Sequence, residues 1–266
     1  MTWPASFMPK RTYDLIRLGG GADGGYLVER RSVETAGSLI SLGICDDWRF
    51  EAEFLGLNDV PLAAFDHTTG ARLFTKVFLN RFLSFASGRA SFRNVIHSAR
   101  KPLEYKHFFR DTRCHERRKV GFQGAGSTDL NTILLGPRSR SPVFLKIDIE
   151  GWEYRILNDI IRNQKKICGL VIEWHDVDLH YKMIENFISE ISLQLVHVHP
   201  NNYADIDRSG NAIALEMSFA ADPVPIGDHP SIPHPLDRPN DSSRPEITLK
   251  ITDASLPGSD TAAPNR

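Results

Sequence analysis

The feature that most constrains the fold is a pair of apolar runs near residue 200 with no room for a helix between them. Residues 194–199 and 212–219 both have the length and composition of strands, and only the segment 200–210, rich in Asn, Asp and Gly, connects them. Parallel strands of one sheet need a long crossover, whereas antiparallel neighbours can be joined by a short loop. The sequence therefore predicts that these two strands pair as an antiparallel hairpin.

Upstream of this hairpin, short apolar runs alternate with longer segments of helical spacing. Such alternation is typical of an α/β domain with a mainly parallel sheet. Strands are predicted over residues 38–43, 61–66, 90–96, 143–149, 169–174, 194–199 and 212–219. Helices are predicted over residues 48–57, 71–82, 128–135, 152–163 and 181–191. We expect one sheet of seven strands, parallel except for its final hairpin.

The chain is predicted to divide into a domain of residues 1–220 and a Pro-rich tail of residues 221–266. Nine of the 16 prolines lie in these last 46 residues, where they exclude helix interiors and central strands. Residues 246–252 alternate apolar and polar side chains, so we expect them to form a short edge strand or to lie on the domain. Residues beyond 254 are expected to be disordered.

Charge and composition exclude several classes of protein. The 32 basic and 33 acidic residues nearly balance, which argues against nucleic acid or an anionic membrane as a partner but leaves room for a local basic patch. One basic run, residues 110–119, is either a solvated face or a site for an anionic substrate group. Three widely spaced cysteines favour a reducing compartment. With no apolar run of about 18 residues and no signal-like N-terminus, we expect a cytoplasmic protein without a membrane span.

A Gly-rich segment, residues 19–26, resembles a dinucleotide-binding loop only in composition. A phosphate-binding glycine loop follows a strand and opens a helix, whereas these glycines precede the first clear strand. Two explanations stay open. The segment is a tight turn in a hairpin ahead of the main sheet, or a flap that places Asp23 or Tyr26 near a ligand.

The loop after the first main strand is better placed for a ligand. Gly43 ends that strand, and Asp66 ends the next one 23 residues later. Open α/β sheets bind ligands beyond the strand ends, and a carboxylate about 20 residues after the glycine accepts hydrogen bonds from ribose hydroxyls. We therefore predict that Gly43, Asp66 and Asp46, from the same loop as Gly43, bind an adenosine-containing cofactor. The alternative for Asp66 is an ordinary turn or helix cap.

The most specific motif spans residues 143–153. Alternation places Lys146, Asp148 and Glu150 on one face near the carboxyl end of a strand. Ionisable groups inside a central strand need partners, because unpaired burial costs several kcal/mol each. Either Lys146 forms a structural ion pair with one of the two carboxylates, or both carboxylates face the crevice and hold a cation or a substrate hydroxyl.

The sequence Leu-Lys-Ile-Asp-Ile-Glu-Gly-Trp-Glu, at residues 145–153, resembles the hallmark strand of FkbM-type S-adenosylmethionine-dependent methyltransferases. The resemblance covers roughly residues 13–240, and an N-terminal Asp-Gly-Gly at 23–25 is similar to that of a methyltransferase-like branch of the family. It implies an α/β fold of class I methyltransferase (Rossmann-like) type, whose seven-stranded, mainly parallel sheet ends in an antiparallel hairpin. This agrees with the hairpin inferred above from loop length.

The resemblance also implies roles for individual residues. The loop at Gly43 would hold the methionine part of S-adenosyl-L-methionine, Asp66 the ribose, and the strand end from Asp148 to Glu150 the substrate side. Asp148 is a candidate for cofactor binding as well as for catalysis. One departure affects the cofactor contacts: many methyltransferases carry Gly-x-Gly after the first strand, whereas Gly43 is followed by Ile44 and Cys45.

Histidines at two strand ends are candidate general bases. His175 is the first choice and His199 the second, with Asp148 and Glu150 completing the predicted catalytic set. The alternative for either histidine is a structural hydrogen bond in a loop. Asp148, Glu150, Glu173 and His175 are also candidate ligands for Mg²⁺ or another divalent cation. No local metal-binding signature demands one.

The sequence thus predicts transfer of a methyl group from S-adenosyl-L-methionine to oxygen, with a small-molecule or glycan acceptor. We expect the acceptor to be a hydroxyl on a sugar, glycan or secondary metabolite, because the family resemblance points there. Two alternatives come from other classes. A nicotinamide-dependent oxidoreductase would share Gly43 and Asp66, and a non-catalytic nucleoside-ligand-binding protein would share the fold.

Overall fold

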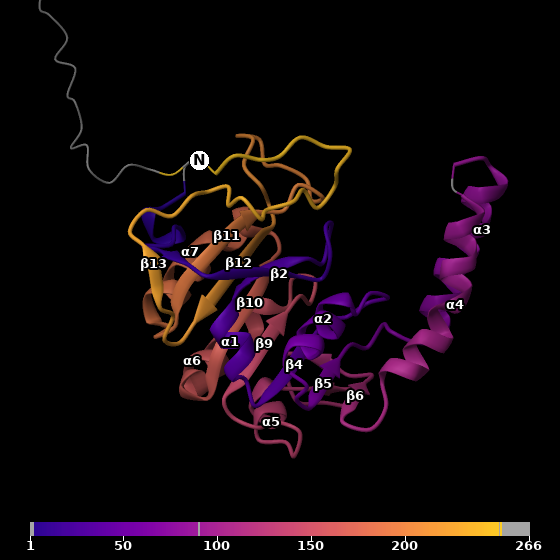
Figure 1. Ribbon diagram of the computed structural model, residues 1–266, viewed down its shortest axis with the longest axis horizontal. Coiled ribbons are helices and arrows are strands. Elements are labelled where there is room, and N and C mark those ends of the chain that lie inside the picture. Colours follow the sequence, from indigo (N-terminus) through magenta and orange to yellow (C-terminus); the bar gives the residue numbers. More distant parts are fainter. Residues whose placement is uncertain (1–2, 90, 250, 252–266) are drawn as a thin grey trace, which may run out of the picture.

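A seven-stranded sheet forms the centre of the computed structural model, which describes residues 3–89, 91–249 and 251 (Figure 1). The strand order is β11-β12-β10-β9-β4-β5-β6, and among these seven strands only β12 runs antiparallel to its neighbours. The bounds are β4 Ser38–Leu42, β5 Leu62–Phe65, β6 Arg113–Glu116, β9 Val143–Ile147, β10 Ile167–Trp174, β11 Gln194–Pro200 and β12 Leu215–Ala220. The predicted Rossmann-like methyltransferase fold, with its antiparallel final hairpin, is confirmed.

One predicted strand is wrong. Most of residues 90–96 belong to helix α4, Phe92–Phe108, and the third strand of the parallel half is β6 instead. Within α4 the two buried residues are Val95 and Ser98, whose spacing of three is helical. The strand β6 lies at the edge of the sheet with all four residues only half-buried, so its sequence carries no apolar signal.

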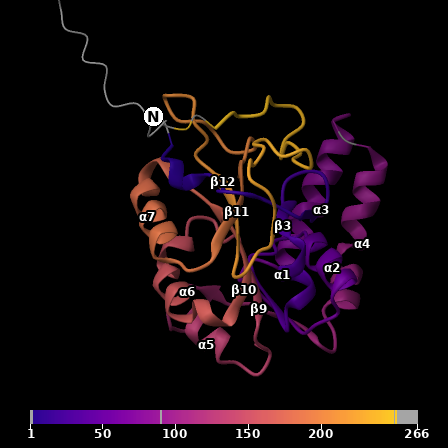
Figure 2. The ribbon, with the colours of Figure 1, turned by 60° about the vertical axis from the view of Figure 1, so that its left-hand side comes forward.

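Helices cover both faces of the sheet (Figure 2). Alternate residues of β4 divide between two cores: Ile40 packs in the core of α5, α6 and α7, and Leu39 in the core of α1 and α2. The bounds are α1 Arg30–Thr35, α2 Arg49–Leu57, α5 Leu130–Leu134, α6 Leu157–Asn163 and α7 Val177–Glu190. Short 3-10 helices span Ala5–Phe7, Glu153–Arg155 and Gln164–Lys166.

Three two-stranded sheets flank the central one. The strands β2, Leu15–Leu18, and β3, Tyr26–Glu29, form an antiparallel hairpin whose turn is the Gly-rich segment. This is the hairpin that one of the two explanations for the segment required. The remaining pairs are β1 Thr12–Tyr13 with β13 Pro225–Gly227, and β7 Lys119–Val120 with β8 Ser127–Thr128.

The Pro-rich segment lies against the domain as far as the structure describes it. Beyond β13 it contacts the loop that follows β11: the Asn202 side chain donates hydrogen bonds to the carbonyls of Asp241 and Arg244. Ile247 and Leu249 pack against the larger core, which agrees with the expectation that this stretch lies on the domain. The boundary at residue 220 stays a prediction, and the expected disorder beyond residue 254 lies outside the described residues.

Two long helices project from the sheet as a helical hairpin (Figure 1). They are α3, Ala71–Ala86, and α4, which together fill the connection between β5 and β6. Near the sheet the hairpin is fixed by aromatic packing, with ring centroids of Phe74 and Tyr105 5.4 Å apart and those of Trp48 and Tyr105 5.9 Å apart. The α3–α4 hairpin therefore occupies the part of the chain in which the sequence predicted the third strand.

Candidate active site

A pocket of about 450 Å³ opens at the carboxyl ends of β4, β5 and β9. Four of the predicted site residues line it: Gly43, Asp66, Asp148 and Glu150. Its volume lies within the range of small-molecule sites, and open α/β sheets bind ligands beyond the carboxyl ends of their strands. The pocket therefore lies where the sequence predicts that the cofactor and the substrate bind.

Gly43 lets the ends of two neighbouring strands touch. Its φ of +84° lies in the left-handed region, and a Cβ at this position would stand 1.6 Å from the carbonyl oxygen of Asp148. The Lys146 ammonium donates a hydrogen bond of 2.7 Å to the Gly43 carbonyl, which joins β9 to the same turn. Any side chain at Gly43 would therefore push the strand ends apart at the mouth of the pocket.

Lys146 is also part of a buried ion pair. Its ammonium lies 3.8 Å from Glu51 Oε1 and 3.9 Å from Asp148 Oδ2, and Ser41 donates a hydrogen bond of 2.5 Å to Glu51. Burial alone would lower the pKa of Lys146, but the charges of Glu51 and Asp148 outweigh it and raise the pKa. Asp148 thus pairs with Lys146 and still lines the pocket, whereas binding of a cation or a substrate hydroxyl by the two carboxylates stays a prediction.

The Asp66 carboxylate holds the loop that follows β4. One oxygen accepts hydrogen bonds from the backbone N–H of Ile44 at 3.0 Å and of Cys45 at 2.8 Å. The other accepts from the N–H and hydroxyl of Thr68, at 2.6 Å each, and from the N–H of Thr69 at 3.3 Å. Burial would raise the pKa of Asp66, but these hydrogen bonds outweigh it and lower the pKa.

A carboxylate offers about four lone-pair positions, so the two loops use the acceptor capacity of Asp66. In this arrangement Asp66 supports the floor of the pocket through the backbone of residues 44 and 45. The contact with a ribose that the sequence predicts for Asp66 stays a prediction.

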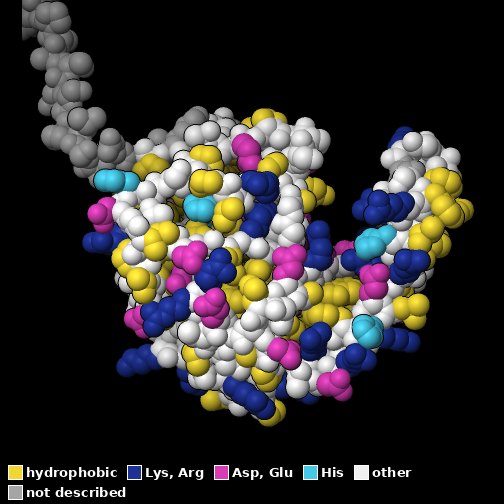
Figure 3. Space-filling model, in the orientation of Figure 1, with side chains coloured by type: hydrophobic (Ala, Val, Ile, Leu, Met, Phe, Trp, Pro, Cys, Tyr) yellow, Lys and Arg dark blue, Asp and Glu magenta, His cyan; other side chains and the backbone are white. Residues whose placement is uncertain are grey.

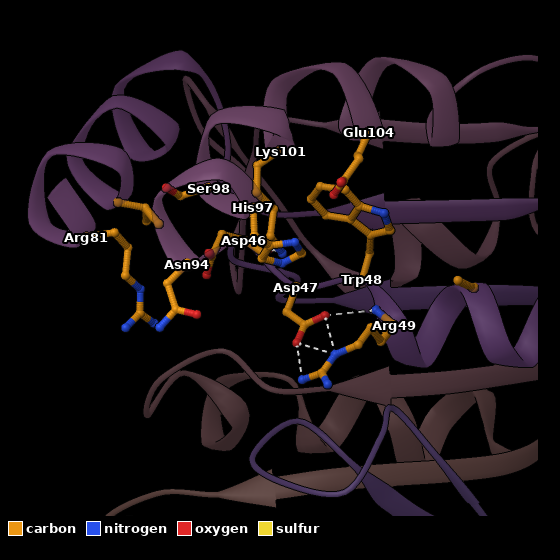
Figure 4. Close-up of a pocket in the computed structure, with 12 residues that line it drawn as sticks. Asp46, Asp47, Trp48, Arg49, Arg81, Asn94, His97, Ser98, Lys101 and Glu104 are labelled. Carbon is orange, nitrogen blue, oxygen red and sulfur yellow. Dashed lines mark hydrogen bonds and ion pairs between the residues drawn. The ribbon is translucent and has the colours of Figure 1, made fainter. Parts of the chain in front are cut away.

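Asp46, the remaining predicted cofactor residue, lines a different cavity. This second cavity, of about 560 Å³, lies between the loop before α2 and the helices α3 and α4 (Figure 4). Asp47 pairs there with Arg49 at 2.5 Å, and the backbone carbonyl of Asp46 accepts a hydrogen bond from Lys101. The structure therefore does not bring Asp46 to the first pocket, and its role in cofactor binding stays a prediction.

A buried polar network lies beside the first pocket. The Tyr26 hydroxyl lies 2.7 Å from Glu173 Oε2 and 3.1 Å from Asp148 Oδ2. The Asn201 amide donates to Glu173 Oε1 at 2.7 Å and lies 3.3 Å from Asp23 Oδ1. The β2–β3 hairpin thus carries Asp23 and Tyr26 to the edge of the central sheet, so the Gly-rich segment is both a turn and a means of placing these residues.

Burial and neighbouring negative charge shift two pKa values in this network. Burial, together with the charges of Asp148 and Glu216, raises the pKa of Glu173 well above its usual range. Burial and the charges of Asp148 and Glu173 likewise raise the pKa of Tyr26 well above its usual range. The phenol of Tyr26 therefore keeps its proton at all physiological pH values and acts as a hydrogen-bond donor.

His175 lies among three carboxylates. Its Nδ1 is 3.1 Å from Glu153 Oε1, and its Nε2 is 3.6 Å from Glu150 Oε2 and 3.9 Å from Glu173 Oε1. Burial alone would lower the pKa of His175, but the hydrogen bond and charge of Glu153, with the charges of Glu173 and Asp148, raise it to about 10. At neutral pH the imidazole is therefore a cation. The role of general base stays a prediction for this residue.

Three of the four predicted metal ligands come together. Asp148, Glu173 and His175 each offer one ligand atom, and these atoms lie within 4.8 Å of one another. Carboxylate oxygens and imidazole nitrogens are suitable ligands for a divalent cation. The three-residue set does not include Glu150, the fourth candidate, whose side chain is 88% exposed.

His199, the second candidate base, is buried elsewhere. Its Nδ1 lies 3.3 Å from Glu216 Oε2 and its Nε2 lies 3.6 Å from Glu246 Oε2 in the C-terminal segment. Asn240 of the same segment donates a hydrogen bond of 2.5 Å to Glu216. His199 is not among the residues that line the first pocket, and its catalytic role also stays a prediction.

Two residues of the site escaped sequence reasoning. Asn201 follows β11 directly, and a polar residue at the carboxyl end of a strand was the only available signal. Glu153 is the last residue of the motif at residues 143–153. The turn at Gly151 brings its carboxylate next to His175. Neither partnership follows from spacing, because each joins residues from different strands.

Comparison with known proteins identifies the central part of the chain. Residues 113–193 match the family described as the methyltransferase FkbM domain. This segment runs from β6 to just beyond α7 and contains Asp148, Glu150, Glu173 and His175. No relative was found among curated proteins. Residues 113–193 thus match the FkbM methyltransferase domain that the strand motif predicts, and this match supports methyltransferase activity.

Proposed function

We propose that the protein is a methyltransferase that uses S-adenosyl-L-methionine and transfers the methyl group to a hydroxyl oxygen of a sugar, glycan or secondary metabolite. The observation that carries the proposal is the continuity between the first pocket and the network around Glu173. Asp148 belongs to both, since it lines the pocket and lies 3.1 Å from the Tyr26 hydroxyl. A methyl donor bound in the pocket and an acceptor bound next to this network would therefore both lie close to Asp148.

The residues of the first pocket fit such a cofactor. Gly43 and Cys45 expose the backbone of the loop after β4, and apolar side chains complete the walls: Phe65, Leu73, Val120, Ile149 and Trp152. A pocket of this volume with mixed polar and apolar walls suits a nucleoside with a short side chain. When bound, S-adenosyl-L-methionine supplies a methyl group that is attached to a sulfonium sulfur. Once the methyl group is transferred, this sulfur belongs to a neutral thioether, which is the leaving group.

The protein contributes orientation and removal of one proton. Displacement at a methyl carbon depends mainly on alignment of the reacting atoms. We propose that the Asp148 carboxylate takes the proton of the acceptor hydroxyl. This carboxylate lines the pocket and contacts Lys146 and Tyr26. His175, with its raised pKa, neutralises the neighbouring carboxylates as an imidazolium.

A pH profile separates Asp148 from His175 as the base. If His175 takes the proton, the rate must rise with pH up to its pKa of about 10, since only the neutral imidazole accepts a proton. A rate that does not rise with pH up to about 9 would exclude His175 as the base and leave the role to Asp148. A rate that increases tenfold per pH unit across this range would return the role to His175.

A divalent cation is a further candidate component, because Asp148, Glu173 and His175 form a suitable ligand set once a bound cation displaces the proton of His175. Bound there, it would acidify an acceptor hydroxyl next to Asp148. Activity measured with chelator and then with added Mg²⁺ or Mn²⁺ decides this. A Glu173→Gln variant that responds to the cation like the wild type would exclude this site.

Calorimetric titration with S-adenosylhomocysteine and with NADH tests the proposed function. We expect binding of S-adenosylhomocysteine and none of NADH, because the loop at Gly43 lacks the further glycines that admit a pyrophosphate. Incubation with labelled S-adenosyl-L-methionine and a panel of hydroxylated acceptors then tests the acceptor class. Binding of NADH alone would support the oxidoreductase alternative and contradict the proposal.

A further inference from the structure

The α3–α4 hairpin carries a charge that the rest of the chain does not share. Residues 71–108 contain eight Lys or Arg residues and one acidic residue, a formal charge of +7, whereas the whole chain carries −1. Within the described residues, none of these eight side chains forms an ion pair with a carboxylate. The near-neutral composition therefore conceals one strongly basic projection.

The outer side of the hairpin is also unusually apolar. In α4, Phe92, Ile96 and Leu103 recur at intervals of four and seven residues, which places them on one face. In α3, Leu79 and Leu83 form a second stripe at an interval of four. Leu83 is 63% exposed and Leu103 is 70% exposed. Figure 3 shows hydrophobic side chains gathered along the outer edge of the hairpin, with basic side chains beside them.

Basic and apolar side chains occupy adjoining positions on these faces. Arg93 and Arg100, seven residues apart, flank the stripe of α4, and Lys76 precedes Leu79 and Leu83 at helical spacing. Near the tip, the ring centroids of Phe85 and Phe92 lie 5.6 Å apart, which links the two helices. The hairpin thus presents one amphipathic basic surface, defined by Lys76, Leu79, Leu83, Phe92, Arg93, Ile96, Arg100 and Leu103.

We propose that this surface docks the protein on an anionic phospholipid bilayer. Amphipathic helices with Lys and Arg beside Phe and Leu bind in the interface of such membranes, where apolar side chains enter the acyl boundary and cations meet the headgroups. The attachment is peripheral: among the described residues, no helix combines the length and the apolar character that a membrane crossing needs. The anionic headgroups supply the negative charges that these eight basic side chains do not meet among the described residues.

Charge favours a bilayer over a second copy of the chain as the occupant. Two copies that met through this surface would bring two hairpins of formal charge +7 together, and like charges at an interface oppose association. An anionic bilayer reverses the sign of this interaction. The inference also does not depend on the first pocket, which lies at the sheet and shares only Lys76 with this surface.

Flotation of the full chain with lipid vesicles tests the proposal. We expect binding to vesicles of phosphatidylcholine with phosphatidylserine, little binding to pure phosphatidylcholine, and release by high salt. A Leu83→Asp/Leu103→Asp variant and an Arg93→Glu/Arg100→Glu variant should each lower binding by at least about tenfold. All four residues are exposed, so thermal melting should match the wild type.

Leu179→Asp is the matched control, because Leu179 is 74% exposed but lies on α7, away from the hairpin. It should bind vesicles like the wild type. The proposal is overturned if the wild type ignores lipid charge, or if both double variants bind like the wild type. It is equally overturned if no vesicles bind and light scattering finds a dimer that Leu83→Asp/Leu103→Asp dissociates, because the surface would then join two copies.

Discussion

The Tyr26 hydroxyl lies 2.7 Å from Glu173 Oε2, although the two residues are 147 positions apart. Tyr26 comes from the small β2–β3 hairpin and Glu173 from the carboxyl end of the central strand β10. Both side chains are buried, and both have pKa values raised by burial and by neighbouring carboxylates. The N-terminal hairpin is therefore a structural part of the candidate site.

Replacing Tyr26 by Phe should destabilise the protein and slow methyl transfer. The variant loses the donor shared by Glu173 and Asp148, and leaving a buried polar group unsatisfied costs about 1–3 kcal/mol. We expect the free energy of unfolding to fall by that amount and kcat to fall at least about tenfold, with little change in cofactor affinity. Tyr13→Phe, which removes a hydroxyl bonded to Gln194 outside the site, is the control. Equal kcat values for the two variants would contradict the role of Tyr26.

Gly43→Ala should disrupt the pocket through steric conflict. The added Cβ would stand 1.6 Å from the Asp148 carbonyl oxygen, so β4 and β9 must separate. Gly210→Ala is a matched control, because Gly210 has a similar φ of +79° but open space around it. The control should cost about 1 kcal/mol of unfolding free energy, and Gly43→Ala several times more, with loss of S-adenosylhomocysteine binding. Similar melting temperatures for both variants would show that the strand ends do not touch.

Asp66→Ala should weaken cofactor binding by releasing the loop after β4. The change leaves the backbone N–H groups of Ile44, Cys45 and Thr69 without their acceptor, at a cost of about 1–3 kcal/mol for each buried donor. Calorimetry should show S-adenosylhomocysteine affinity reduced by at least about tenfold. Asp47→Ala, in the loop after β4 but facing the other cavity, should keep wild-type affinity. Wild-type affinity in both variants would remove Asp66 from the site.

The pairing of His175 with carboxylates should make stability depend on pH. Its pKa is about 10 in the folded protein, above the ordinary value of 6.5, so its contribution is complete below pH of about 6.5 and is lost as pH rises through about 10. The difference in unfolding free energy between wild type and His175→Asn should therefore shrink across this interval in urea titrations. A difference that grows with pH would contradict the assigned charge.

The sheet was predictable because its central strands are apolar and the polar segment between its last two strands has no helical pattern. The third strand was not predictable, because β6 has the polar sequence Arg-Cys-His-Glu at the edge of the sheet. In addition, the first residues of α4 form a short apolar–polar run that resembles a strand. Local pattern decides the type of a buried element better than that of a half-exposed one.

The residues that line the first pocket were predictable where they directly follow a strand. Asp148 and Glu150 lie in the loop after β9, and Gly43 and Asp66 directly follow β4 and β5. Asp46 follows the same strand end yet turns to the second cavity, because the loop after Cys45 reverses direction at a positive φ of +44°. The partnerships of Tyr26, Asn201 and Glu153 depend on packing between distant elements, which periodicity does not encode.

A crystal structure with S-adenosylhomocysteine tests the central claim most directly, because we expect the ligand in only one of two cavities of similar size. We expect the ligand in the pocket of about 450 Å³, with its amino acid part at Gly43 and its sulfur directed toward Asp148. S-adenosylhomocysteine bound instead in the cavity of about 560 Å³ beside α3 and α4, or absent from both at saturating concentration, would contradict the proposed methyltransferase site.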